Sequence, residues 1–529
     1  MAKILRGPEG ETFQSMEEQV AALEAKKSKY REMGGPERVA RQHAAGKQTA
    51  RERLDLLLDP GTFTEIGLLA HHQSQHPSLK DKYTPADGVI TGYGEVDGRR
   101  VCVAAYDFTV LAGSMGEVGE GKVARLRMMA LRWGVPMIWL LDSAGARIQE
   151  FTGSQFARAG DLFREQVIMS GVVPQVAAMM GHCAAGTAYI PALADFVPMV
   201  KGLSSMALGG PHLVKAAVGE DVDVNELGGS KVHCEISGCG DMEVEDDEEC
   251  IAAVKEFLSY LPSNNREQPP VIPGDDPPDR RVEELRKIVP ANPRQVYDMR
   301  KVITSIVDHG HLFEIKPRWA RNLVTGFARL AGRPVGIVAN QPMYLGGVLD
   351  VDSADKATRF IRLCDAFNVP LLFLQDIPGF LIGTKVEKQG IIRHGAKMLY
   401  AVSEATVPKV TVIVRKAYGA GYFVMCGAGY EPDLLVAWPT AEISVMGPEG
   451  ATNIIYRKEI AAAEDPDALW AERTAQFRKL IDPYLAAAYG YIDDVIDPAD
   501  TRAVVIWGFE LAQTRKMDRP WKKHGVMPV

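Results

Sequence analysis

The chain contains two copies of one sequence pattern, separated by a constant offset of 234 residues. Pairs of residues at this offset include Thr91-Gly92 with Thr325-Gly326, Val135-Pro136 with Val369-Pro370, and Asp142 with Asp376. The offset holds over about a hundred residues, as expected for a repeated structural unit. It predicts two copies of one fold, each with an equivalent site.

Inside each copy, apolar strands alternate with helices. A β-branched run comes first, followed by a helix in which Val123, Leu126, Ala130 and Trp133 share one face. A short strand then ends at an aspartate, as PMIWLLD or PLLFLQD, and a second strand leads into a Gly/Ala-rich turn. The order predicts an α/β fold with largely parallel strands, whose sites lie at the carboxyl ends of the strands.

The length of 529 residues favours two domains over one core. A stretch from Ser263 to Arg280 holds five prolines and predicts a linker. We therefore expect an N-terminal domain at residues 1–265, a linker at 266–280 and a C-terminal domain at 281–529. Residues 12–58 are charged and rich in Ala and Leu, and predict helix.

Composition excludes several classes of protein. The net charge of -8 argues against a nucleic-acid partner. The seven cysteines include no CxxC pair, which argues against a disulfide framework and against a metal site. No targeting segment is evident, and prolines and glycines interrupt the one long uncharged run, Ile168 to Ala194. We interpret that run as a buried strand, turn and helix, and expect a cytoplasmic protein without a membrane span.

Two turns of small residues are the strongest candidate sites. Residues 181–186, GHCAAG, follow an apolar strand, and Tyr418-Gly419-Ala420-Gly421 stands at the same offset in copy two. Small residues let a ligand approach backbone N–H groups, which is what an oxyanion hole requires. Tight packing of helix on strand also needs small residues, but the recurrence of the turn favours the functional interpretation.

Other candidates are weaker. Asp142 and Asp376 are either bases or caps of the turns that follow them, and Arg147 is either an anion contact or a surface salt bridge. His182 suits a hydrogen-bonded wall better than a base. Residues 116–122 have the spacing of a phosphate-binding loop, but Val123 replaces the Ser or Thr that binds magnesium. The pattern indicates chemistry performed by backbone donors.

The chain resembles the carboxyltransferase (beta) subunit of biotin-dependent acyl-CoA carboxylases, a family that includes the propionyl-CoA and methylcrotonyl-CoA types and the transcarboxylase large subunit. The motifs that carry the resemblance are GKQTARERLDLLLDPGTF from Gly46, DSAGARIQE from Asp142, IPGFLIGT from Ile377, GIIRHGAKMLYAVSEATVPK from Gly390 and AWPTAEISVMGPEGA from Ala437. The resemblance implies two tandem crotonase-like domains. It also implies a homohexamer that works with a separate biotin carboxylase and biotin carrier chain, with the site formed between the N-domain of one subunit and the C-domain of another.

The resemblance also implies roles for individual residues. Ala185-Gly186 would hold the thioester enolate oxygen, and Ala420-Gly421 would hold the ureido oxygen of biotin. Residues near coenzyme A or biotin would be Ala144, Gly145, Ala146, Arg147, Gly419 and Tyr422, and those lining the acyl pocket would be His182 and Phe423. No metal is implied in this chain.

The chain departs from the family pattern at these sites. The family usually has Pro-Cys-Ala-Gly-Gly at residues 182–186, where this chain has HCAAG, and propionyl-type subunits often carry Asp in place of Phe423. The sequence therefore leaves the identity of the acyl group undetermined. Two alternatives to an acyl-CoA carboxylase subunit remain: the carboxyltransferase of a sodium-pumping acyl-CoA decarboxylase, and a non-catalytic scaffold that binds coenzyme A.

Overall fold

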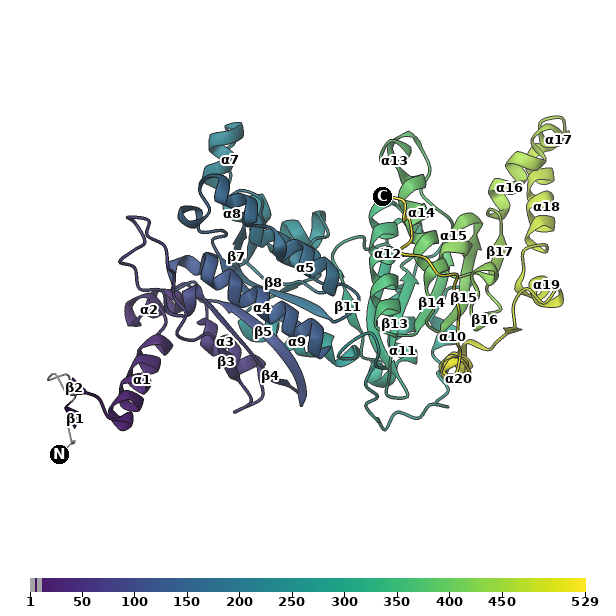
Figure 1. Ribbon diagram of the computed structural model, residues 1–529. Coiled ribbons are helices and arrows are strands. Elements are labelled where there is room, and N and C mark those ends of the chain that lie inside the picture. Colours follow the sequence, from purple (N-terminus) through teal and green to yellow (C-terminus); the bar gives the residue numbers. More distant parts are fainter. Residues whose placement is uncertain (1–4, 7–11) are drawn as a thin grey trace. The chain divides into compact units, whose positions relative to one another are not determined.

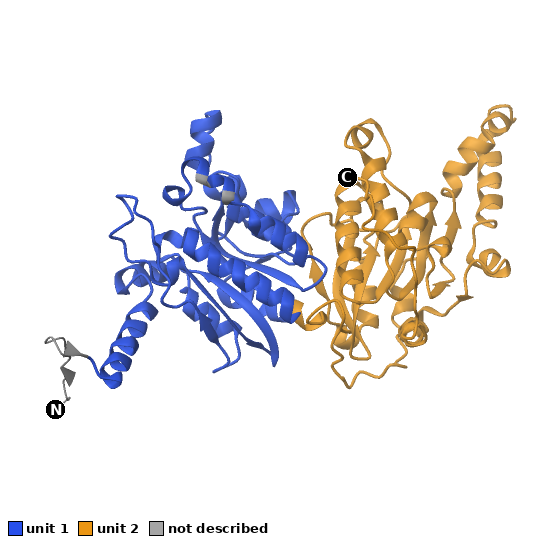
Figure 2. Ribbon diagram, in the orientation of Figure 1, with its two compact units in different colours: residues 1–255 blue, residues 256–529 orange. Residues whose placement is uncertain are grey.

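The computed structural model describes residues 5–6 and 12–529. It divides into two compact units, Met1–Lys255 and Glu256–Val529, which Figure 2 distinguishes by colour. Each unit is built around an eight-stranded sheet of mostly parallel strands covered by helices (Figure 1). The predicted α/β class is confirmed.

Unit 1 has the strand order β10-β8-β7-β6-β5-β4-β3, with β9 paired to β7. Strand β4 is antiparallel to both of its neighbours, whereas β5, β6, β7, β8 and β10 run parallel. The strands of this sheet are β3 (Thr64–Ile66), β4 (Val89–Val96), β5 (Arg99–Tyr106), β6 (Met137–Ser143), β7 (Gln175–Ala184), β8 (Pro198–Val200), β9 (Ser205–Ala207) and β10 (Met242–Val244). A two-stranded pair, β1 (Leu5–Arg6) and β2 (Thr12–Phe13), lies outside the sheet.

Unit 2 has the order β11-β12-β13-β14-β15-β16-β18, with β17 paired to β15. Its strands are β11 (Phe313–Ile315), β12 (Leu323–Leu330), β13 (Arg333–Asn340), β14 (Leu371–Ile377), β15 (Lys409–Tyr418), β16 (Leu434–Ala437), β17 (Glu442–Ser444) and β18 (Asp494–Val495). Strands β13, β14, β15 and β16 are parallel, so their carboxyl ends meet at one edge.

The offset of the sequence repeat reappears strand by strand. Strands β12, β13, β14 and β15 begin and end 234 residues after β4, β5, β6 and β7. The register between β6 and β7 shifts after Leu141, and that between β14 and β15 shifts at the equivalent Gln375. Each shift is a bulge that lengthens the second strand just before its small-residue turn, and bulges commonly re-aim side chains near sites.

Helices cover both faces of each sheet. In unit 2, α12 (Val351–Ala366) packs on one face, while α11 (Met299–Ile306) and α20 (Thr501–Ala512) pack on the other through a core that contains Val302, Val335 and Phe509.

The helices of unit 1 are α1 (Met16–Arg31), α2 (Pro36–Ala44), α3 (Ala50–Leu57), α4 (Glu117–Trp133), α5 (Asp161–Met169), α6 (Tyr189–Leu193), α7 (Pro211–Val218) and α8 (Val224–Gly228), and α9 (Asp247–Tyr260) crosses the boundary. Those of unit 2 are α10 (Leu285–Ile288), α11 (Met299–Ile306), α12 (Val351–Ala366), α13 (Thr384–Lys388), α14 (Ile391–Glu404), α15 (Gly419–Val424), α16 (Pro448–Ile455), α17 (Arg457–Ala461), α18 (Pro466–Arg478), α19 (Pro483–Ala488) and α20 (Thr501–Ala512).

Two local expectations need correction. Residues 12–58 are divided among β2, α1, α2 and α3, because Gly35 and Gly46 interrupt the helical pattern with positive φ. Trp133 is 51% exposed, whereas the other three residues of its predicted face are buried. It ends α4 and packs edge-to-face on Tyr93, at the margin of the core.

The uncharged run Ile168 to Ala194 forms the end of α5, all of β7, a helical turn and α6, as predicted. Within the described ranges, no helix combines the length and apolarity needed to cross a bilayer.

Candidate functional site

The turn after β7 places Ala185 and Gly186 at the carboxyl edge of the first sheet. Ala185 has a φ of +54°, in the left-handed region, and begins a short 3-10 helix that runs to Ala188. The first N–H groups of a helix have no acceptor within it. The amides of Ala185 and Gly186 therefore have no acceptor within the helix, as the donors of an oxyanion hole require.

A left-handed backbone is strained for alanine. The carboxyltransferase subunits that the sequence resembles usually have glycine at the position of Ala185. We expect Ala185→Gly to raise the free energy of unfolding by about 0.5–1 kcal/mol, because the left-handed conformation costs L-residues about 1–2 kcal/mol. Chemical denaturation of the variant measures this. Ala184→Gly is the matched control: Ala184 has a φ of -120°, an ordinary extended conformation, so its replacement should lower stability. A lower stability for Ala185→Gly would contradict the strain.

The loop after β6 packs directly on this turn. Gly145 has a φ of +95°, and a Cβ added there would lie 2.6 Å from the carbonyl oxygen of Ala184. Two backbone hydrogen bonds fix the loop, from Met115 N to Gly145 O at 2.9 Å and from Arg147 N to Met115 O at 2.8 Å. Ala144 N donates to Ala112 O. Residues 144–147 thus lie beside the turn, positioned by backbone contacts, and their contact with coenzyme A stays a prediction.

The guanidinium of Arg147 is occupied inside the protein. The side chain is 3% exposed and forms ion pairs with Asp87 at 2.7 Å and Glu150 at 2.9 Å. It also donates to Ser114 O. Arg147 therefore forms a buried salt bridge that ties the loop to the preceding turns, not the surface salt bridge that was one of the two expectations; contact with an anionic ligand stays a prediction.

A cavity of about 440 Å³ lies beside this loop, with Arg147, Ala112, Thr109 and Arg38 among its lining residues. Arg38, at the start of α2, is exposed and gives one N–H to Thr109 O at 3.2 Å. Its remaining donors are available to an anion, and Arg guanidinium suits phosphate. Sequence reasoning missed Arg38 because it lies 109 residues before Arg147 and belongs to no recognisable motif.

The sequence placed His182 inside the turn 181–186, but residues 181–184 form the end of β7, so His182 lies in the strand and is half-buried. Its Nδ1 forms a 2.8 Å hydrogen bond with Ser205 Oγ on β9. Burial lowers the pKa of His182, and the charge of Lys47 lowers it further, so the neutral imidazole is favoured. A neutral, hydrogen-bonded ring suits a wall of the site; its contact with an acyl group stays a prediction.

The second copy reproduces the turn. Gly419 follows β15 with a φ of +57° and stands 234 residues after Ala185, so the two left-handed residues are equivalent. Ala420 is exposed and Gly421 is buried, with its missing Cβ directed at Ile377. The hydrogen bonds of the loop recur as well, from Leu349 N to Gly379 O at 3.1 Å and from Leu381 N to Leu349 O at 2.7 Å.

The side chains of the two aromatic candidates, Tyr422 and Phe423, have different surroundings. Tyr422 uses its hydroxyl to accept a hydrogen bond from Ala428 N at 2.9 Å, so it braces the following turn. Phe423 is 47% exposed and packs against Tyr430, with ring centroids 6.3 Å apart. An exposed aromatic face beside a small-residue turn is available to an apolar ligand.

Two left-handed turns were not predicted. Leu111–Gly113 and Leu345–Gly347 have positive φ at every residue and stand at the same offset. Each lies against a strand end: a Cβ on Gly113 would lie 2.3 Å from Asp142 O, and one on Gly347 would lie 2.7 Å from Asp376 O. The paired glycines were the signal that could have found them.

The strand-end aspartates are structural in both copies. Asp142 is buried and pairs with Lys47 Nζ at 3.0 Å and Arg53 Nη1 at 3.3 Å. Asp376 is buried and binds Arg415 Nε at 2.9 Å. Both carboxylates hold groups from other segments, not the turns that follow them, so neither of the two expected roles, base or cap, describes what the structure shows.

Comparison with known proteins identifies the family. A model described as the carboxyl transferase domain matches residues 41–527. The propionyl-CoA carboxylase carboxyltransferase subunit of Haloferax mediterranei is 47% identical over 97% of this chain and 100% of its own length. Methylmalonyl-CoA decarboxylase subunit alpha of Veillonella parvula is 45% identical over 97% of this chain and 100% of its own length.

Among solved structures, that of transcarboxylase 12S with methylmalonyl-coenzyme A and methylmalonic acid bound matches with a TM-score of 0.94 and 48% identity, covering 98% of this chain and 99% of that one. The match extends through both units and supports the expected pair of crotonase-like domains. This chain belongs to the carboxyl transferase family and is an acyl-CoA carboxyltransferase.

Proposed function

We propose that the chain transfers a carboxyl group between biotin on a partner chain and the α-carbon of an acyl-CoA, with the two small-residue turns as its two oxyanion holes. The observation that carries the proposal is the recurrence of one geometry: Ala185 and Gly419 are left-handed, equivalent, and placed at the carboxyl ends of β7 and β15. One reaction between two carbonyl-containing partners needs two such sites.

In the N-terminal domain, residues 1–265, the amides of Ala185 and Gly186 would bind the thioester oxygen. They would stabilise the negative charge that this oxygen carries in the enolate, after the α-proton has been removed. Residues 144–147 would line the coenzyme A site. Arg38, which lines the adjoining cavity, would contact the anionic groups of coenzyme A. His182, held neutral by burial, would line the acyl group without competing for the proton.

In the C-terminal domain, residues 281–529, the turn at Gly419–Gly421 would receive biotin. The fit rests on the donor set: the first backbone N–H groups of α15 have no acceptor within the helix and suit a ureido oxygen, which only accepts hydrogen bonds. Carboxybiotin would supply the carboxyl group. Gly419 keeps the turn open, since a Cβ there would lie 3.0 Å from Val445 O, and Tyr422 braces the turn from behind.

The assembly follows from the same relatives. Transcarboxylase 12S is described as a hexamer, and we propose a homohexamer for this chain too. We also propose a biotin carboxylase and carrier chain as its partner, because the sequence contains no Met-Lys-Met biotinylation site. Co-purification with that partner, followed by mass measurement of the complex, tests both statements.

The acyl group is proposed to be apolar, with propionyl-CoA the first candidate because the matching subunit of Haloferax mediterranei is that of a propionyl-CoA carboxylase. Phe423 stands where propionyl-type subunits often have Asp, and its exposed ring favours an apolar tail over a polar one. The holoenzyme should therefore carboxylate propionyl-CoA and also accept longer or branched apolar acyl-CoAs.

A panel of acetyl-, propionyl-, 3-methylcrotonyl- and longer acyl-CoAs tests this proposal through bicarbonate- and ATP-dependent carboxylation with the partner chain present. We expect Phe423→Asp to lower kcat/KM for the longer substrates relative to propionyl-CoA by about tenfold or more, since each methylene next to an apolar wall contributes about 1–3 kcal/mol. Phe423→Tyr keeps the aromatic face and is the control. An unchanged profile for Phe423→Asp would remove this residue from the pocket.

A decarboxylase subunit is the second candidate, because the relative from Veillonella parvula is 45% identical over 97% of this chain. It would use the same half-reactions in the opposite direction. The two candidates separate by partner: a biotin carboxylase supports the carboxylase, and an integral membrane subunit supports the decarboxylase. Failure to exchange carboxyl between free biotin and any malonyl-type CoA would instead indicate a scaffold.

A further inference from the structure

A second cavity, of about 480 Å³, lies in unit 2 at the end of the sheet remote from the proposed carboxyl-transfer site. Its rim includes Pro334, Pro370 and Pro408, which stand at the starts of the parallel strands β13, β14 and β15. The turn at Gly419 follows the other end of β15. Ten residues of strand separate the two edges, a distance of about 30 Å at the usual rise. A ligand in this cavity cannot touch the reacting groups.

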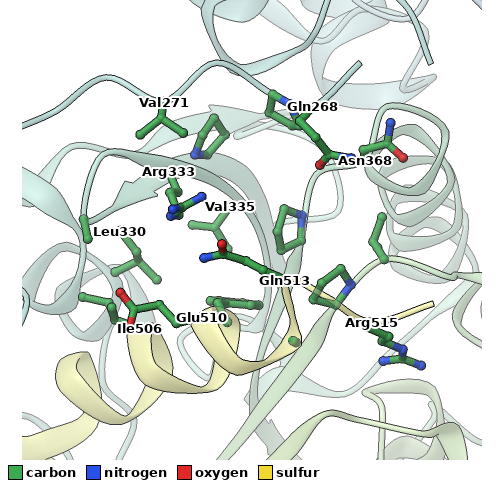
Figure 3. Close-up of a pocket in the computed structure, with 18 of the residues that line it drawn as sticks. Gln268, Val271, Leu330, Arg333, Val335, Asn368, Ile506, Glu510, Gln513 and Arg515 are labelled. Atoms are coloured by element: carbon green, nitrogen blue, oxygen red, sulfur yellow. The ribbon is translucent and has the colours of Figure 1, made fainter. Parts of the chain in front are cut away.

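The walls come from three parts of unit 2. Helix α20 supplies one side, the strand starts supply the floor, and the proline-rich segment 268–271 closes the top (Figure 3). This segment is fastened in place: Arg329 Nη1 donates to Pro270 O at 3.0 Å, and Ile272 N donates to Gly332 O at 3.0 Å. The cavity is therefore preformed, as small-molecule sites usually are.

Two opposite charges face this space without neutralising each other. Arg333 begins β13, and Glu510 lies in the last turn of α20. Among the described residues, neither has an ion-pair partner within 4.0 Å, whereas Arg515 in the same lining is bound to Asp433. Figure 3 shows the side chains of Arg333, Gln513 and Glu510 around the same space.

Much of the remaining lining is apolar, and Gln268, Asn368 and Thr406 add uncharged polar groups. Leu330, Val335, Val407 and Phe509 contribute side chains that are at most 7% exposed. The cavity thus joins one unpaired cation, one unpaired anion and several uncharged polar groups to an apolar floor. A ligand that matches both charges and the floor needs a carboxylate, an ammonium group and an apolar body.

We propose that this cavity binds a free α-amino acid with an apolar side chain. The carboxylate would pair with the Arg333 guanidinium, whose planar fork matches it, and the ammonium group would pair with Glu510. The side chain would lie on Leu330, Val335 and Phe509, where its burial removes apolar surface from water. A plain carboxylic acid or a plain amine would leave one of the two charges unmatched.

Calorimetric titration of the full-length protein with leucine and with phenylalanine tests the proposal. 4-Methylpentanoate and 3-methylbutylamine are the comparison ligands, because each keeps the apolar body and one charge of leucine. We expect the amino acids to bind at least about tenfold more tightly than either comparison ligand. Binding of 4-methylpentanoate as tight as that of leucine would overturn the role of Glu510, and the same result with the amine would overturn the role of Arg333.

Two exposed charges are then removed one at a time. Arg333→Gln and Glu510→Gln should each weaken binding about tenfold or more, and Lys516→Gln, an exposed charge just beyond α20 that does not line the cavity, should leave binding unchanged. Thermal unfolding of each variant verifies that it is folded. No binding to the wild-type protein at about 10 mM amino acid, or equal binding to all variants, would overturn the proposal.

Discussion

Replacing Gly186 by alanine is expected to lower kcat for carboxyl transfer by about 10²-fold or more while the protein stays fully folded. A lost or displaced oxyanion donor costs about 10²–10³ in rate. The fold tolerates the change, because the added Cβ would meet only Phe163 Cζ, at an ordinary 3.8 Å. The open side of Gly186 is therefore available to the methyl group, which would occupy space that the thioester needs.

The measurement pairs steady-state carboxylation with thermal unfolding. Gly121→Ala is the matched control, since Gly121 is an exposed glycine of α4 with nothing near its missing Cβ. We expect that variant to keep full activity. Gly421 is a poorer test, because its added Cβ would lie 2.7 Å from Ile377 and disturb packing. A Gly186→Ala enzyme within about threefold of wild type would remove this amide from the oxyanion hole.

Lys356→Met is expected to lower the free energy of unfolding of unit 2 by about 3–5 kcal/mol, because four backbone carbonyls lose their hydrogen-bond donor. The side chain is 2% exposed. Its ammonium group donates to the carbonyls of Lys316 at 2.8 Å, Trp319 at 3.0 Å and Leu323 at 2.7 Å, and also to Ala320. Methionine fills the volume but leaves these carbonyls without a donor, and each unsatisfied buried group costs about 1–3 kcal/mol.

Lys122→Met is the internal comparison, because Lys122 is the equivalent residue of the first copy. Its Nζ donates to Ala86 O and Val89 O, each at 2.7 Å, and we expect a smaller loss of about 2–3 kcal/mol. Denaturant unfolding, followed by tryptophan fluorescence, measures the effect, since Trp139 is buried in unit 1 and Trp319 and Trp438 are buried in unit 2. A loss below about 1 kcal/mol for Lys356→Met would show that water replaces the ammonium group.

The same lysine makes stability depend on pH. Burial lowers the pKa of Lys356 from 10.5 to about 7. Between these two values the unfolded chain binds more protons than the folded chain, so stability should rise as the pH increases from about 7 toward 10.5. Lys356→Met lacks this contribution, and its stability should rise less over the same range. A wild-type protein without the steeper rise would contradict the lowered pKa.

Much of the site could be predicted from the sequence because it is made of backbone. The small-residue segments 181–186 and 418–421 were found from their place after apolar strands. Residues 181–184 and Tyr418 still belong to the strands, and the turns begin at Ala185 and Gly419, which share a left-handed φ. Such conformations are local and follow from residue type and offset. The uncharged run Ile168 to Ala194 was also interpreted correctly, since prolines and glycines limit the length of its elements.

Side-chain roles could not be predicted in the same way. Arg147 suited an anion contact by its place in the motif, yet it is buried against Asp87, 60 residues earlier in the chain. Asp142 and Asp376 occupy equivalent positions, but the first is bound by Lys47, which lies 95 residues before it, and the second by Arg415 from the neighbouring strand. Only folding decides which of many distant charged groups meets a given carboxylate.

The sequence by itself determined the duplication, the strands that carry it and the two turns, because a repeat offset and short-range periodicity are written along the chain. The tertiary structure alone decided the bulges before the turns, the partners of the buried charges and the cavity between α20 and the strand starts. These depend on packing between segments that are far apart in the sequence, where shape and burial select the contacts.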